Sequence, residues 1–140
     1  MGRANAATLI SMSQGDSQSA SMNRFLEELR ADRETNAILD EHLADNDVVL
    51  AHLLVADLRR RAEQLHAEGD LDRLAALLEI LNTALRDGDE YLKDAVEISF
   101  VEDSNLWEPS ARTFLATWPQ ALKDEAELQR LWRLEDRAGR

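Results

Sequence analysis

Two leucine-rich segments, separated by Gly69 and Asp70, restrict this chain to helical folds. Residues 47–67 and 70–87 carry apolar side chains three and four residues apart, the spacing that places side chains on one side of an α-helix. Glycine typically ends a helix and aspartate typically caps the next one, so the turn between the two segments is short. We therefore predict an antiparallel helix pair at the centre of the fold.

Shorter segments with the same spacing lie on both sides of this pair. They predict helices at about residues 23–31, 35–45, 89–100, 110–116 and 117–134. Thr35 or Asn36 is the expected cap of the 35–45 helix, and Asn46 or Asp47 is the expected cap of the 47–67 helix. The predicted fold class is all-α, an irregular bundle of about six to seven helices.

Apolar stripes predict which sides of the later helices face the core. The inward side of the 89–100 helix is predicted to carry Tyr91, Leu92, Ala95, Ile98 and Ser99. The inward side of the last helix is predicted to carry Ala121, Leu128, Leu131 and Trp132. Regular spacing would turn Phe100 and Val101 outward and Glu102 inward, so we predict a break or a tight turn near residue 100.

The start of the chain differs in composition from the rest. Residues 1–21 are rich in serine, alanine, glutamine and asparagine and have no helical spacing. This composition is typical of segments that do not fold. We predict a disordered leader or an overlong start at 1–21 and a single helical domain at 22–140, since a chain of this length usually holds one core.

The charge of the chain limits its partners. The sequence has 28 acidic and 16 basic residues, a formal net charge of −12 and a pI of about 4.6. Such a charge repels nucleic acid and anionic membrane, so neither is an expected partner. The sequence has no cysteine and no apolar run of the roughly 20 residues that span a bilayer. The cytoplasm is therefore the predicted compartment.

Motifs for metal binding and catalysis are incomplete. Glu63 and His66 have the Glu-x-x-His spacing of di-iron bundles, but such a site needs two pairs, and neither His42 nor His52 follows a glutamate by three residues. The acidic pairs at 45–47 and 87–89 lack the glycine and glutamate of a calcium loop. Nucleophile motifs and an evident serine–histidine pair are also missing. We predict no metal, no cofactor and no catalytic residue.

The segment 87–108 is the strongest candidate for a binding surface. It holds eight carboxylates and one cation, Lys93, and includes Trp107 between Asp103 and Glu108. An aromatic ring surrounded by acids can anchor a basic partner, because complementary charge speeds encounter and a buried ring supplies affinity. The predicted partner-binding residues are Asp94, Glu97, Glu102, Asp103, Trp107 and Glu108. Two alternatives stay open: the carboxylates serve only solubility, and Trp107 with Trp118 covers the end of the central pair.

Several segments resemble a known family. Val96, Ser99, Phe100 and Glu102 form a Val-x-x-Ser-Phe-x-Glu segment, and residues 41–43, 50–58 and 77–81 add weaker similarity. Together they resemble a bacterial family of small acidic all-helical domains of unknown function, over about residues 24–134. The resemblance implies a helical fold and a bacterial origin, and it implies no reaction.

Three classes of function follow from these observations. The first is a non-enzymatic acidic protein-binding domain, in particular an immunity protein or antitoxin that masks a basic partner. The second is an accessory or scaffold subunit that acts as a homodimer, which an exposed apolar surface on the third or fourth helix would favour. The third is an enzyme whose site is assembled from residues distant in sequence.

Overall fold

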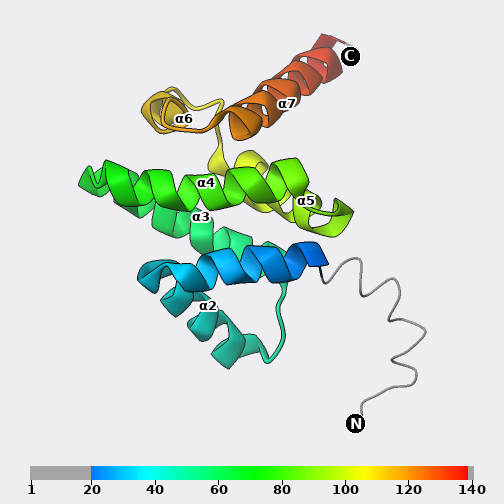
Figure 1. Cartoon of the computed structure of the whole chain (residues 1–140). Helices are drawn as coiled ribbons and strands as arrows, with labels where there is room; N and C mark the ends of the chain where they lie inside the picture. Colours follow the sequence, from blue (N-terminus) through cyan, green and yellow to red (C-terminus); the bar gives the residue numbers. More distant parts are fainter. Residues whose placement is uncertain (1–19, 139–140) are drawn as a thin grey trace, which may run out of the picture.

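The computed structural model describes residues 20–138, which form seven α-helices and no strands, as the predicted all-α class requires. A first helix at 20–31 is followed by α2 (Arg33–Asn46), α3 (Ala51–Glu68), α4 (Leu71–Asp87), α5 (Glu90–Val96), α6 (Arg112–Leu115) and α7 (Gln120–Ala138). The first helix and α2 lie on one side of α3 and α4, and α6 and α7 lie on the other (Figure 1).

The predicted central pair is present. Gly69 ends α3 in the left-handed region, with φ 76°, and Asp70 caps α4 by accepting a hydrogen bond from the Arg73 amide. α3 packs against α2, α4 and α5, and its side chains Leu54 and Leu58 are fully buried. The local signals for this turn were sufficient because Gly69 and Asp70 are themselves the two residues that connect the helices.

The start of α3 differs from the prediction. Residues 47–50 form a loop instead of the first turn of the 47–67 helix. Asn46 and Asp47 do not cap α3: Asn46 ends α2, and Asp47 adopts a φ of 65° and donates its N–H to the Leu43 carbonyl. The buried His42 side chain then accepts the Leu50 N–H through Nε2, at 3.0 Å. This contact holds the loop against α2 and makes α3 begin at Ala51.

The N-terminal boundaries also shift. Asp32, and not Thr35 or Asn36, caps α2, because its carboxylate accepts the backbone N–H groups of the next turn. Thr35 is buried and donates its hydroxyl to the Leu29 carbonyl. Residues 1–19 of the predicted leader lie outside the described residues, whereas Ser21 is helical and accepts a hydrogen bond from the Asp89 N–H at 2.9 Å.

The expected irregularity near residue 100 is a π-helix. After α5, residues Glu97–Val101 form π turns and Glu102–Ser104 form a 3₁₀ turn. A π turn contains more residues than an α turn, so the inward stripe moves along the sequence. Phe100 and Val101 are buried, while Ile98 is 41% exposed and Tyr91 is 39% exposed. The predicted inward positions of Ile98 and Tyr91 are therefore wrong, and that of Ser99 is right.

The last helix is only partly packed. Its first turns bury Leu122, whose N–H donates to the Asn82 side chain of α4 at 3.1 Å. Trp118, just before it, contacts the Phe100 and Phe114 rings. The second half extends beyond the other helices (Figure 1), and Leu128, Leu131 and Trp132 are 43%, 48% and 58% exposed. The prediction that these three residues face the core is wrong, because no other helix reaches that part of α7.

Candidate functional site

Carboxylates from α5, the π turns and α7 gather at one place. We call Glu90, Asp94, Glu97 and Glu125 the acidic surface. Partial burial raises the pKa of Glu97 above its ordinary value, and the charges of Glu125 and Asp94 raise it further. The Gln129 amide donates to the Glu97 carbonyl at 3.0 Å and to the Glu125 carboxylate at 2.8 Å, so it joins α7 to the π turns. Within residues 20–138, Glu90, Glu97 and Glu125 make no ion pair.

An exposed aromatic side chain lies on the α7 side of this surface. Glu125, Leu128 and Trp132 are three and seven residues apart, and therefore share one side of the helix. Trp132, which is 58% exposed, is the aromatic side chain on the same side of α7 as Glu125, whereas the sequence analysis had named Trp107. The helical spacing of Leu128 and Trp132 was a visible signal, but spacing alone does not tell a core stripe from an unpartnered one.

The predicted site residues do not form one surface. Asp94 and Glu97 belong to the acidic surface. Glu102 and Asp103 are exposed on the 3₁₀ turn, and their carboxylates make no hydrogen bond or ion pair with the described residues. Trp107 and Glu108 line a separate groove along α7.

This groove has a volume of about 780 Å³ and lies between α7, α6 and the turn before α6. Its walls are formed by Leu106, Trp107, Glu108, Arg112, Leu115, Gln120, Lys123, Asp124, Ala126, Glu127, Arg130, Arg133 and Leu134. The Arg133 guanidinium carbon lies 4.1 Å from the centre of the Trp107 ring, a cation–π contact. Trp107 is 51% exposed in this groove, whereas Trp118 is buried in the core.

A serine, a histidine and an aspartate are also brought together, although the sequence suggested no such set. The His52 ring contacts the Ser99 hydroxyl through Nδ1 at 3.0 Å and the Asp94 carboxylate through Nε2 at 3.7 Å. This order of groups resembles a nucleophile, a base and an orienting acid. Ser99 is only 6% exposed, however, and a substrate carbonyl has little access to its hydroxyl. We interpret the set as a polar connection that joins α3 to α5, through Asp94, and to the π turns, through Ser99.

The candidate metal ligands have other partners. Glu63 pairs with Arg59 at 3.0 Å, and the His66 ring packs against the Phe114 ring. His42 accepts the Leu50 N–H in the core. Within residues 20–138, no three histidine or acidic side chains are arranged to hold a metal ion. None of the helices in that range is long and apolar enough to cross a lipid bilayer.

Comparison with known proteins identifies a family but no activity. A family model described as a domain of unknown function, DUF7674, matches residues 22–133, from the first helix to the exposed half of α7. No curated protein and no solved structure shows a significant match to the chain. The matched range includes the Val96–Glu102 segment and covers most of the sequence. The chain therefore belongs to the DUF7674 family of domains of unknown function.

Proposed function

We propose that this protein is a non-enzymatic binding domain that captures a basic protein partner on the acidic surface. The observation that carries this proposal is the group of Glu90, Glu97 and Glu125, which have no ion-pair partner among the described residues. Glu125 shares one side of α7 with the exposed Leu128 and Trp132. A partner's arginine or lysine would relieve the repulsion between these carboxylates. The apolar pair would supply a contact that excludes water.

An immunity protein or antitoxin is the form of this function that we favour. A toxin that acts on nucleic acid or another anionic substrate has a cationic active surface, and an acidic domain can cover it. The net charge of −12 would attract such a partner over distance, and the acidic surface with Trp132 would determine where it docks. This mechanism needs contact alone and no catalytic group.

The experiment is affinity capture from the source cell's lysate at low and high salt. The test variant reverses Asp94, Glu97 and Glu125 to lysine. Its matched control reverses Glu41, Glu68 and Glu79, which are exposed and make no ion pair with the described residues. We expect the wild type and the control to retain a basic protein that high salt releases, and the test variant to lose it. Equal capture by all three proteins, with unchanged helical circular dichroism, would refute the acidic surface as the binding site.

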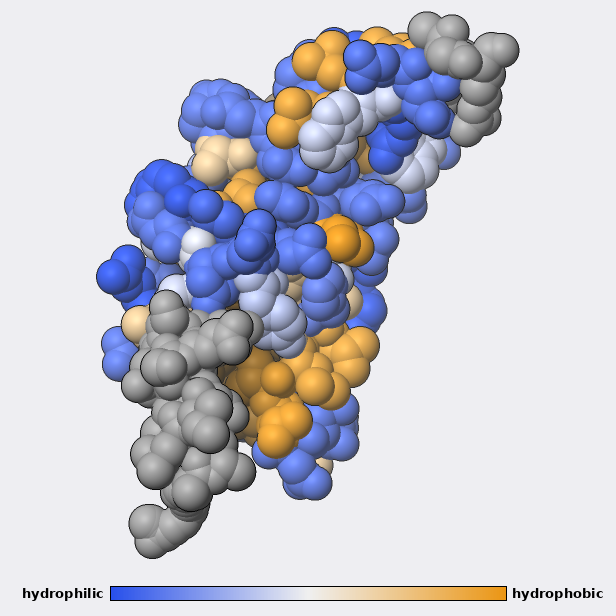
Figure 2. Space-filling model, turned by 90° about the vertical axis from the view of Figure 1, so that its right-hand side faces the viewer, coloured by the Kyte–Doolittle hydropathy of each residue, from blue (hydrophilic) through white to orange (hydrophobic). Residues whose placement is uncertain are grey.

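A second candidate, a homodimeric scaffold subunit, is favoured by a different observation. Val48, Leu50 and Leu53, in the loop before α3 and its first turn, are 58%, 39% and 52% exposed. Viewed from the side of this loop, the molecule shows a concentrated apolar patch on its lower part (Figure 2). Apolar surface of this kind often marks a contact between subunits.

The scaffold function predicts self-association through this patch. Sedimentation velocity should show a dimer for the wild type and a monomer for Val48→Ser/Leu53→Ser, with little dependence on salt. Leu128→Ser/Trp132→Ser is the control with a similar loss of apolar area elsewhere, and it should remain dimeric. A wild-type protein that stays monomeric over the whole accessible concentration range rules this candidate out.

A further inference from the structure

The groove beside Trp107 differs in charge from the rest of the molecule. Four cations and three carboxylates line it, whereas the whole chain has 16 cations and 28 carboxylates. Arg130 is paired with Glu127 on the same helix, and Asp124 accepts a hydrogen bond from Gln120. Arg112 and Lys123 make no ion pair with any residue in the described part of the chain. Two cations of the groove are therefore free to meet an anionic group.

The groove also offers apolar contacts. Leu106, Leu115 and Leu134 line it together with the half-exposed Trp107 ring. Arg133 lies over one side of this ring and holds it in place beside α7. Apolar side chains between cations suit a ligand that is itself both apolar and acidic.

The length of the groove distinguishes a peptide from a compact small molecule. Its α7 wall runs from Gln120 to Leu134, which corresponds to about 21 Å at 1.5 Å per residue. A helix of about 14 residues has this length. The α7 wall is helical and uses its backbone groups internally, and residues 20–138 contain no strand whose edge could pair with an extended peptide. An occupant that satisfies its own backbone, an α-helix, therefore fits best.

We propose that this groove binds an acidic amphipathic helix of a partner protein. The apolar side of that helix packs against Trp107, Leu115 and Leu134, and its carboxylates face Arg112 and Lys123. This site is independent of the acidic surface: Lys123 and Trp132 are nine residues apart, which is about two and a half turns, and so lie on opposite sides of α7.

The test uses two synthetic helical peptides of about 16 residues, long enough to fill the groove. Both carry leucines at positions i, i+3, i+4 and i+7, and the remaining positions are mainly glutamate in one and mainly lysine in the other. Fluorescence anisotropy of the labelled peptides measures binding to the full chain. We expect saturable binding of the glutamate peptide, weakened about tenfold by Arg112→Ala/Lys123→Ala and also weakened by Trp107→Ala.

The control variant is Arg24→Ala/Arg33→Ala, which removes the same charge from exposed positions outside the groove and should bind like the wild type. Arg24, Arg33, Trp107 and Arg112 are exposed and Lys123 is half-buried, and circular dichroism should show an unchanged helix content for every variant. The proposal is overturned if the glutamate peptide does not bind, or if the control loses as much affinity as the test variant. It is also overturned if the Arg112/Lys123 variant abolishes a dimer of the wild type, since the occupant would then be a second copy. Binding of the lysine peptide reports on the acidic surface and leaves the proposed function to be judged separately.

Discussion

Adjacent leucines in α3 show how strongly the energetic role of a residue depends on its side of the helix. Leu54 is fully buried between neighbouring helices, and Leu53 is 52% exposed. Both are leucines in the same helical turn, so their intrinsic helix propensity is equal. The difference between them is the apolar area that folding removes from water.

Leu54→Ala should lower the free energy of unfolding by about 2–5 kcal/mol, because it leaves a cavity in the core. Leu81 in α4, also fully buried, should behave alike. Leu53→Ala, as the matched control, should change the free energy of unfolding by less than about 1 kcal/mol. Urea denaturation followed by circular dichroism measures both. Similar losses at Leu53 and Leu54 would contradict the described packing of α3.

The raised pKa of Glu97 predicts that the stability of the protein depends on pH. Partial burial, Glu125 and Asp94 raise its pKa in the folded protein above the ordinary value of 4.5, so ionisation of Glu97 opposes folding. This opposition is absent below the unfolded pKa, where Glu97 is protonated in both states, and is complete above the raised folded pKa. Glu97→Gln should therefore increase stability at pH 7 and not near pH 3.

Thermal unfolding at the two pH values tests this prediction. Asp87→Asn is a comparison variant for which we expect the opposite change in stability at pH 7. Hydrogen bonding to Arg86 lowers the pKa of Asp87, so its ionised form favours folding and its replacement should reduce stability at pH 7. Because Asp87 is exposed to solvent, this reduction should be small. A Glu97→Gln gain that is equal at both pH values would mean that ionisation is not its cause.

At the scale of elements, the position of a helix end depends on hydrogen bonds within one turn. Which side of a helix is buried depends on the helices packed against it. Asp70 caps α4 as predicted, and Asp89, the first residue of the predicted 89–100 helix, caps α5; each accepts an N–H within the next turn. The π turns after α5 bring both Phe100 and Val101 into the core, where Phe100 lies 4.8 Å from the Trp118 ring centre. Burial of these two side chains compensates for the weaker geometry of a π turn.

The two glycines at the ends of α3 and α4 should respond differently to alanine. Gly69 has a positive φ and open space around it, so Gly69→Ala should cost about 1–2 kcal/mol from backbone strain alone. A Cβ at Gly88 would lie 2.4 Å from the Ala84 carbonyl oxygen, which belongs to the helix backbone. Gly88→Ala should therefore cost more. Gly69→Asn should recover part of the Gly69→Ala loss, because asparagine tolerates the left-handed region.

Urea denaturation of the three glycine variants gives the comparison. If Gly88→Ala proves milder than Gly69→Ala, the end of α4 must be able to move, and the close approach to Ala84 does not restrain it.

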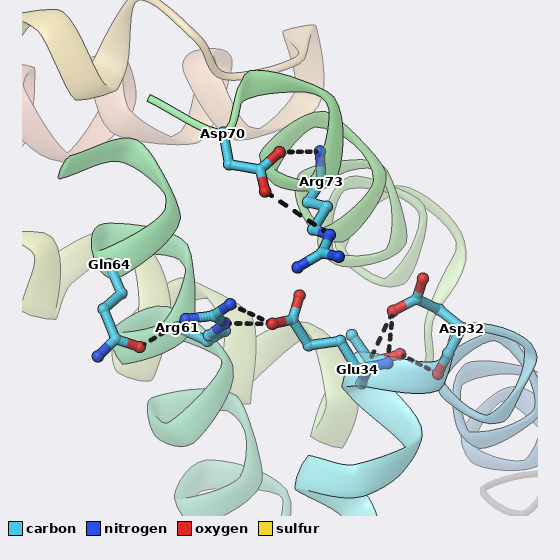
Figure 3. A network of polar contacts seen from close by, with 7 residues as sticks. Asp32, Glu34, Arg61, Gln64, Asp70 and Arg73 are labelled. Atoms are coloured by element: carbon cyan, nitrogen blue, oxygen red, sulfur yellow. Dashed lines mark hydrogen bonds and ion pairs between the residues drawn. The ribbon is translucent and has the colours of Figure 1, made fainter. Parts of the chain in front are cut away.

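At the scale of the whole molecule, long-range contacts join helices that the sequence presents separately. Arg61 of α3 binds Glu34 of α2 and also donates to Gln64, while Asp70 and Arg73 form the neighbouring pair at the start of α4 (Figure 3). Glu34 and Arg61 are both largely covered, so their pair is shielded more than an ordinary surface ion pair. Cations and carboxylates are thus matched on this side, in contrast to the acidic surface.

The candidate site was only partly predictable from the sequence. The acidity of residues 94–97 is a property of the sequence, and the structure places these carboxylates beside Glu125. The choice of aromatic residue depended on folding: Trp107 turns toward Arg133 in the groove, and Trp132 is exposed on the part of α7 that no helix covers. Trp107 was chosen because it is close in sequence to residues 94–97. The helix that lies beside these carboxylates, α7, is about 30 residues further along the chain, and sequence spacing does not indicate that contact.

The helical class, the central pair and the caps at Asp70 and Asp89 follow from the sequence alone, because each depends on hydrogen bonds and side-chain spacing within one or two turns. The exposure of Leu128 and Trp132, the His52 contacts with Ser99 and Asp94, and the cation-lined groove arise only in the tertiary structure. Each of these features depends on where helices distant in sequence cross or fail to cover one another, and the spacing of residues within a single helix carries no information about that.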